Sequence, residues 1–285
     1  AAVLCVISCK TTDIGAQNEV KAKEFSTQLE SPTPERLIEL GEKYREAGDS
    51  LKALDYFNTA IKINPSYAPA YTYRGMLYMR IKAYTKAVKD FEKAVKLTPN
   101  PNPKKSEDLM AYLLYGFCHY QLGNYEQAIF VFSQTIRINP YYADVYNFLG
   151  LSYFNLKQYE QALEEYTSAI HFGEIVKGAQ DAYYLNRGRT YGVLGDYEKA
   201  IADFTKSIEL KADVAEVYVE RGGAYNLLEK YDKALNDFTQ ALLLESRLTI
   251  AYIGCGMVYY NMGKYEESVD RSEERRVGKE CTSWC

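Results

Sequence analysis

The sequence predicts an all-α fold, a solenoid of about seven helix–turn–helix repeats whose last member is truncated. The first observation is a series of glycines at intervals of 34, 41, 34, 38, 34 and 34 residues: Gly41, Gly75, Gly116, Gly150, Gly188, Gly222 and Gly256. The second is an alanine twelve residues after each of the first six: Ala53, Ala87, Ala128, Ala162, Ala200 and Ala234. Small residues at this offset allow two helices to touch. We therefore expect each glycine to lie where the first helix of a repeat crosses the second, and a leucine at Gly150 to overpack that crossing.

Aromatic residues recur in the same frame. Of 28 tyrosines, six lie four residues before a repeat glycine, six lie three after it, six lie nine after it, and Tyr166 takes the place that phenylalanine has in other repeats. Side chains of this size fill the volume beside a helix crossing. Core packing therefore accounts for most of the tyrosines, and base stacking or an aromatic cage is the weaker explanation.

The first repeat shows the whole pattern in Leu40-Gly41-x-x-Tyr44, Ala53, Phe57, Ala60 and Pro65. This pattern resembles the tetratricopeptide repeat (TPR) family over residues 34–270. The resemblance implies a right-handed α-solenoid with repeats at 34–67, 68–108, 109–142, 143–180, 181–214 and 215–248 and a partial repeat at 249–270. Extra residues fall between repeats, around residues 100–105 and 173–178, where we expect protruding loops.

The family binds protein or peptide partners on a concave surface lined by first helices, and the resemblance carries that role to matching positions here. The implied groove residues are Thr72, Met76, Met79, Leu113, Phe117, Tyr120, Asn147, Leu151, Phe154, Leu185 and Arg189. Lysines that would clamp a C-terminal carboxylate are missing, since Thr72, Leu113 and Leu185 stand there. The apolar character favours an amphipathic helix or an extended hydrophobic segment. Alternatively, some of these side chains pack between neighbouring repeats.

Composition and motifs indicate neither an enzyme nor a nucleic-acid partner. The formal charge is −4, with no stripe of lysine and arginine. The histidines, His119 and His171, lie apart in the sequence, and the short segment 254–256 falls within an expected helix rather than after a strand. The sequence therefore predicts no catalytic residue, no metal site and no cofactor.

Arginine directly precedes three of the repeat glycines, and aspartate follows each of these arginines after sixteen residues. The pairs are Arg74 with Asp90, Arg187 with Asp203, and Arg221 with Asp237. In the repeat where Leu149 precedes the glycine, Glu165 stands at the position that aspartate has in these three repeats. We expect three ion pairs that join the two helices of a repeat.

The first residues resemble the end of a bacterial lipoprotein signal peptide. Val6-Ile7-Ser8-Cys9 resembles a lipobox, which would make Cys9 the lipidation site and residues 10–33 a flexible polar tether. The alternative is a truncated ordinary leader or an unrelated apolar end. At the other terminus, residues 271–285 resemble a translated sequencing adapter more than a protein motif, and we treat them as an artefact.

Together these features predict a non-catalytic interaction scaffold that is lipid-anchored in the bacterial cell envelope. The membrane contact is expected through the lipid alone, and the partner through the apolar groove. Two alternatives stay open. The repeats could be the recognition module of a larger enzyme or of a secretion or assembly protein, or the chain could be a cytoplasmic adaptor.

Overall fold

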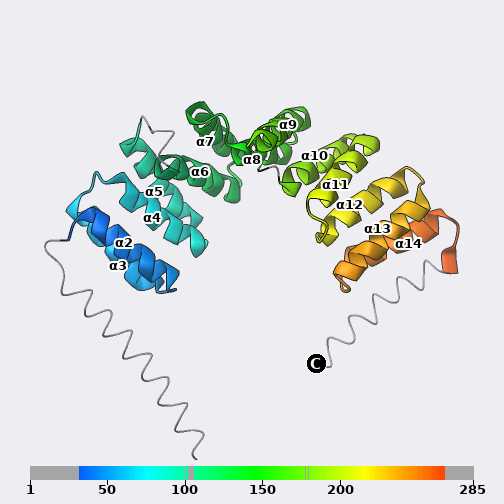
Figure 1. Cartoon of the computed structure of the whole chain (residues 1–285), viewed down its shortest axis with the longest axis horizontal. Coiled ribbons are helices and arrows are strands. Elements are labelled where there is room, and N and C mark those ends of the chain that lie inside the picture. Colours follow the sequence, from blue (N-terminus) through cyan, green and yellow to red (C-terminus); the bar gives the residue numbers. More distant parts are fainter. Residues whose placement is uncertain (1–31, 100, 102–105, 177, 179, 267–285) are drawn as a thin grey trace, which may run out of the picture. The chain divides into compact units, whose positions relative to one another are not determined.

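The computed structural model describes residues 32–99, 101, 106–176, 178 and 180–266, and the side chains of 106–108 are not described. The predicted lipobox, most of the tether and the adapter-like end lie outside these residues. Every regular element within the described ranges is a helix, in agreement with the predicted all-α fold (Figure 1). None of these helices is long and apolar enough to cross a bilayer.

The described helices form antiparallel pairs in two compact units that divide at Thr98 and Pro99. The N-terminal unit contains α2 (Pro34–Glu46), α3 (Ser50–Ile63), α4 (Ala68–Arg80) and α5 (Tyr84–Leu97). The C-terminal unit contains α6 (Ser106–Gln121), α7 (Tyr125–Ile138), α8 (Ala143–Asn155), α9 (Tyr159–Ile175), α10 (Asp181–Leu194), α11 (Tyr197–Leu210), α12 (Ala215–Leu227), α13 (Tyr231–Leu244) and α14 (Thr249–Asn261). Helix α6 begins three residues before the third repeat that the sequence suggests. Residues 173–175 extend α9 by almost one turn, so this part of the second insertion is helical and not the expected loop.

The first six repeat glycines lie where the sequence predicts, at the crossing of the two helices. A Cβ atom at Gly150 would lie 2.6 Å from Cε1 of Tyr166, and one at Gly41 would lie 2.3 Å from Cε1 of Phe57. The alanines twelve residues after the glycines are fully buried. In the first six repeats each crossing is thus built from a glycine, an alanine and one aromatic ring sixteen residues after the glycine, which leaves no room for a further methyl group.

The tyrosine four residues before the glycine has a second function in the fold. The hydroxyl groups of Tyr71 and Tyr146 donate to the backbone carbonyl oxygens of Pro65 and Pro140, six residues earlier, at 3.0 and 3.1 Å. In the repeat with the longer connection, the hydroxyl of Tyr184 instead donates to the carboxylate of Glu174 at 2.8 Å. These bonds hold the connection between repeats against the following first helix.

The turns between the two helices of a repeat contain one residue with a left-handed backbone. Glycine takes this place in alternate repeats, at Gly48, Gly123, Gly195 and Gly263, with φ between 75° and 86°. In the remaining repeats Lys82, Lys157 and Glu229 take it, with φ between 58° and 60°. In each turn the next residue's amide donates to a carbonyl five residues back, for example Gln158 to Tyr153. This bonding pattern is a Schellman-type helix end.

Candidate functional site

The three predicted arginine–aspartate pairs are present. In the Arg187–Asp203 pair, Nε and one terminal nitrogen of the guanidinium donate to the two carboxylate oxygens, each at 2.8 Å. The other two pairs have the same fork geometry, at 2.6–2.8 Å in Arg74–Asp90 and 2.8 Å in Arg221–Asp237. The aspartate side chains are only 3–8% exposed. These are buried structural pairs rather than surface ones, so removal of one partner costs more stability than in an exposed pair.

Each of these guanidinium groups also reaches the preceding repeat. The remaining terminal nitrogen of Arg187 donates to the hydroxyl of Thr167 at 3.1 Å, and that of Arg221 donates to Thr205 at 3.0 Å. The hydrogen bond to Asp203 raises the pKa of Arg187, and burial opposes that increase less strongly. The Arg187 guanidinium therefore stays charged, and its hydrogen bonds connect three helices.

Glu165 occupies the aspartate position in the repeat that has Leu149 in place of arginine. No ion pair found among the described residues includes Glu165. Burial, followed by the charge of Glu164, raises the pKa of Glu165 to about 7. The folded protein consequently holds this proton more firmly than the unfolded chain at mildly acidic pH.

The pH dependence of stability should reveal this carboxyl group. Between pH 4.5 and about 7 the folded state binds the Glu165 proton more tightly, so stability falls as pH rises and levels off above pH 7. Because the side chain is partly exposed, we expect the wild-type free energy of unfolding to fall by only about 1–2 kcal/mol over this range on account of Glu165. The variant Glu165→Gln should not show this decrease. Urea unfolding between pH 4 and 8 measures it. Glu160→Gln, at an exposed position of the same helix, should retain the wild-type slope, and parallel profiles for wild type and Glu165→Gln would contradict the assignment.

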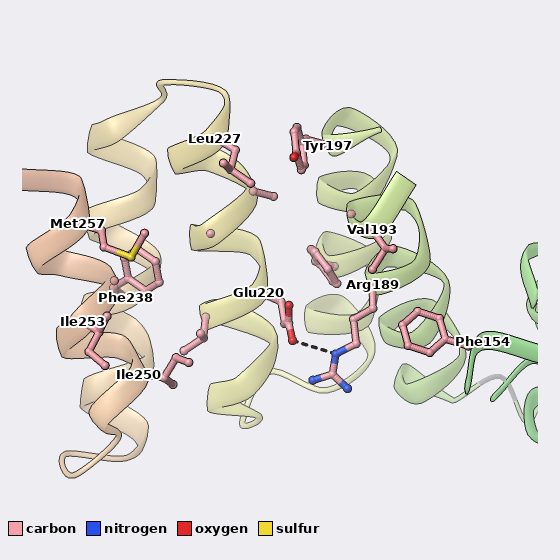
Figure 2. Close-up of a pocket in the computed structure, with 16 residues that line it drawn as sticks. Phe154, Arg189, Val193, Tyr197, Glu220, Leu227, Phe238, Ile250, Ile253 and Met257 are labelled. Atoms are coloured by element: carbon pink, nitrogen blue, oxygen red, sulfur yellow. Dashed lines mark hydrogen bonds and ion pairs between the residues drawn. The ribbon is translucent and has the colours of Figure 1, made fainter. Parts of the chain in front are cut away.

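An open groove lies in the C-terminal unit along the first helices α8, α10, α12 and α14. Its volume is about 530 Å³ (Figure 2). Phe154 lines it from α8, Val193 from α10 and Leu227 from α12. The side chains of Ile250, Ile253 and Met257 line it from α14, and each is at least 40% exposed. An exposed apolar surface of this kind on a folded domain is typical of a binding site. We call it the α8–α14 groove.

Three glycines line the groove, and two of them, Gly192 and Gly223, leave it hollow. The predicted groove residues stand three before, one after or four after a repeat glycine; Arg189 is one after Gly188. In the same register, Gly192 is four after Gly188 and Gly223 is one after Gly222. A Cβ atom at Gly192 or Gly223 would meet nothing within 4 Å. These glycines have no packing reason comparable to that of Gly150, and they leave the groove floor open.

An arginine bonded to two glutamates lies between the apolar sides of the groove. Nε of Arg189 donates to the carboxylate of Glu220 at 2.9 Å, and a terminal nitrogen of the same guanidinium donates to Glu216. Burial alone would lower the pKa of Arg189, but the two carboxylates more than offset it, so that the pKa is raised. Arg189 and Glu220 are the charged residues among those that line the groove.

Among the predicted groove residues, Phe154 and Arg189 line the α8–α14 groove. Thr72, Asn147 and Leu185 are buried; the amide of Asn147 accepts a hydrogen bond from Asn186 at 2.9 Å. The half-buried ones are Met76, Met79, Leu113, Phe117, Tyr120 and Leu151, and of these Leu113, Phe117 and Tyr120 pack against the buried cluster around Phe132. Their role in binding a partner stays a prediction.

Sequence reasoning missed Gly192, Val219, Gly223, Ile253 and Met257. The signal was available, because these residues occupy the same three groove positions: Gly192 completes the repeat of Leu185 and Arg189, and the other four continue the pattern into the next two repeats. What the register could not show is that Leu185 is covered by its neighbours while Ile253 is not. Exposure depends on the side chains of adjacent repeats and not on the position alone.

The described residues contain no group of three or more His, Cys, Asp and Glu side chains suited to a metal ion. Both described cysteines, Cys118 and Cys255, are buried and unbridged. Burial raises the pKa of Cys118 to about 12, so its thiol stays protonated and a poor nucleophile at neutral pH.

Tetratricopeptide repeat family models match residues 35–67, 66–140, 119–176, 182–213 and 215–247. The chain belongs to the TPR family. Among the curated relatives, dynein axonemal assembly factor 4 of Rattus norvegicus is 28% identical over 119 residues, which are 41% of this chain and 28% of the relative. The chain thus spans under a third of that relative's length.

Solved structures agree with this fold. A tetratricopeptide repeat protein from Parabacteroides merdae matches with a TM-score of 0.64 and 17% identity, over 86% of this chain and 92% of that one. YrrB, described as a TPR protein with an unusual peptide-binding site, matches with a TM-score of 0.54 and 16% identity, over 66% of this chain and 91% of that one. At this identity the likeness concerns the fold alone.

Proposed function

We propose that this TPR protein is a non-catalytic scaffold that binds a segment of another protein in the α8–α14 groove. The observation that carries the proposal is the coincidence of groove-register glycines with exposed apolar side chains: the floor is open at Gly192 and Gly223, and Ile253 and Met257 stand exposed beside it. A buried repeat core has no need of this combination. Helical glycines cost about 0.5–1 kcal/mol each relative to alanine, so the open floor lowers stability.

The comparisons support a peptide or protein as the ligand class. The YrrB structure is described as that of a TPR protein with an unusual peptide-binding site. The apolar lining also suits side chains of a peptide better than a highly charged small molecule, because desolvation of unpaired charges is costly.

Selection from a random 12-residue peptide library displayed on phage tests the proposal. Wild-type protein should enrich a set of peptides that bind it, and Gly223→Leu should bind them at least tenfold more weakly because leucine fills the floor. This variant should keep its fold, since a Cβ atom at this position meets no neighbour. Lys206→Leu, which adds a leucine at an exposed position of α11 outside the groove, is the matched control and should bind as wild type does. If no peptide is enriched, or if Gly223→Leu binds the selected peptides equally well, the groove is not the binding site.

We further propose that the protein is anchored in the bacterial envelope through lipid on Cys9. The support is the sequence Val6-Ile7-Ser8-Cys9 with the polar stretch that follows it. Labelled fatty acid should be incorporated into the protein expressed behind a complete lipoprotein leader in a bacterial host, and Cys9→Ala should abolish the incorporation. Equal labelling of wild type and variant would exclude Cys9 as the site, and absence of label from both would favour a cytoplasmic adaptor.

A further inference from the structure

Arg189 and Glu220 line the α8–α14 groove, and Glu216, which is bonded to Arg189, lies beside that lining; the cluster of these three side chains has unequal numbers of positive and negative groups. Arg189 contributes one positive charge, and the carboxylates of Glu216 and Glu220, both bonded to it, contribute two negative charges. The net charge of the cluster is therefore −1. The side chain of Glu216 is 61% exposed and that of Glu220 is 36% exposed, so both carboxylates keep lone pairs directed to a ligand or to solvent.

The excess negative charge matters for binding because the cluster lies where a ligand would cover it. In Figure 2 the Arg189–Glu220 pair lies between two apolar surfaces, formed by Ile253 and Met257 on one side and by Phe154 and Val193 on the other. A ligand that covers these surfaces displaces water from around the carboxylates. Electrostatic interactions strengthen when water is excluded, and an uncompensated negative charge would then cost free energy.

Building on the proposed binding function, we infer that the groove selects protein segments in which a lysine or arginine stands between two large apolar side chains. The apolar side chains cover the α14 surface and the α8–α10 surface, and the basic group completes the charge of Glu216 and Glu220. An acidic residue at the central place would meet a net negative cluster and is disfavoured.

The spacing of the first helices limits the length of such a segment. Packed helices lie about 8–10 Å apart, so α10 and α14, separated by α12, are about 20 Å apart. An extended peptide rises about 3.3 Å per residue and crosses this distance in about six residues. A helical ligand would need about thirteen residues at 1.5 Å each. A 12-residue library can therefore supply an extended ligand in full and nearly all of a helical one.

The peptides selected on wild-type protein test the inference through their composition. We expect at least a threefold enrichment of lysine and arginine over the unselected library, at positions flanked on both sides by large apolar residues. Enrichment of apolar peptides without this basic residue, or with aspartate or glutamate in its place, overturns the inference and leaves the proposed binding function intact. Failure of any peptide to depend on Gly223 overturns both.

Charge variants of the cluster provide the matched series. Glu220→Gln changes its net charge from −1 to 0, and Glu216→Gln with Glu220→Gln changes it to +1. The preference for a lysine peptide over the same peptide with glutamine should fall at each step, and in the double variant a glutamate peptide should bind best. Fluorescence anisotropy with these three peptides measures the order, and circular dichroism checks that each variant is folded. If the order of the three peptides is unchanged in the double variant, the inference is contradicted. It is also contradicted if the wild-type protein sediments as a dimer and Gly223→Leu dissociates that dimer, because the groove would then hold a second copy of the chain.

Discussion

Replacement of Arg187 by methionine is expected to lower the free energy of unfolding by about 3–5 kcal/mol. The change leaves the carboxylate of Asp203, only 8% exposed, without the two hydrogen bonds from the guanidinium. The cost comes mainly from this unpaired buried charge. In the intact pair, the attraction between the two groups offsets the free energy of removing both from water. Replacing both residues, Arg187→Met with Asp203→Leu, should return the stability to within about 1.5 kcal/mol of wild type, since apolar side chains of similar volume can substitute for a buried pair.

Urea unfolding of wild type, the two single variants and the double variant gives the coupling energy. We expect at least about 3 kcal/mol for Arg187 with Asp203, at the upper end of the range for contacting residues, because loss of either partner alone is costly and loss of both is not. The exposed pair of Lys206 and Glu209, at 3.0 Å on the same repeat, is the control and should couple by no more than about 0.5 kcal/mol. Since a repeat protein can unfold locally, hydrogen exchange in α10 and α11 should show the same order. A coupling below about 0.5 kcal/mol for the buried pair would mean that the carboxylate finds other partners.

These pairs show which features the sequence could predict. Arg187 and Asp203 are connected by a fixed offset, because two helices of constant length and a short turn place residues sixteen apart face to face. The same reasoning correctly placed Gly150 at the crossing of the two helices, but the contact of that position with the Tyr166 ring is known only from the structure. What the offset did not reveal was the low exposure of the carboxylates, or the additional hydrogen bond from Arg187 to the Thr167 hydroxyl of the preceding repeat.

The groove was harder to predict for the same physical reason. Residue positions along a first helix follow from the repeat, so Phe154 and Arg189 could be named in advance. The open volume depends instead on what is missing, namely the side chains at Gly192 and Gly223. A glycine in the sequence can mark either a tight crossing or an open floor, and only the neighbouring atoms distinguish the two.

The distinction between these two kinds of glycine leads to opposite effects of one substitution. Gly150→Ala is expected to destabilise the protein by about 1–3 kcal/mol, because the new methyl group would lie 2.6 Å from the buried ring of Tyr166. Gly223→Ala is expected to stabilise it by about 0.5–1 kcal/mol, because alanine favours the helix and the methyl group meets no atom within 4 Å. Both positions lie inside helices, α8 and α12, so helix propensity alone predicts the same sign for both.

Thermal and urea unfolding of the two alanine variants decide between propensity and packing. A second measurement isolates the contact, since Tyr166→Leu removes the ring that the methyl group would strike. In that background Gly150→Ala should cost at least 1 kcal/mol less than it does in wild type, given the coupling expected between groups in direct contact. If Gly150→Ala stabilises the protein, or if its cost is unchanged by Tyr166→Leu, the crossing can widen and the glycine is not required by the ring. Leucine should enlarge the difference between the two positions. Gly150→Leu must separate α8 from α9 and should destabilise the protein. Gly223→Leu extends into the open groove, so it should abolish peptide binding without loss of stability.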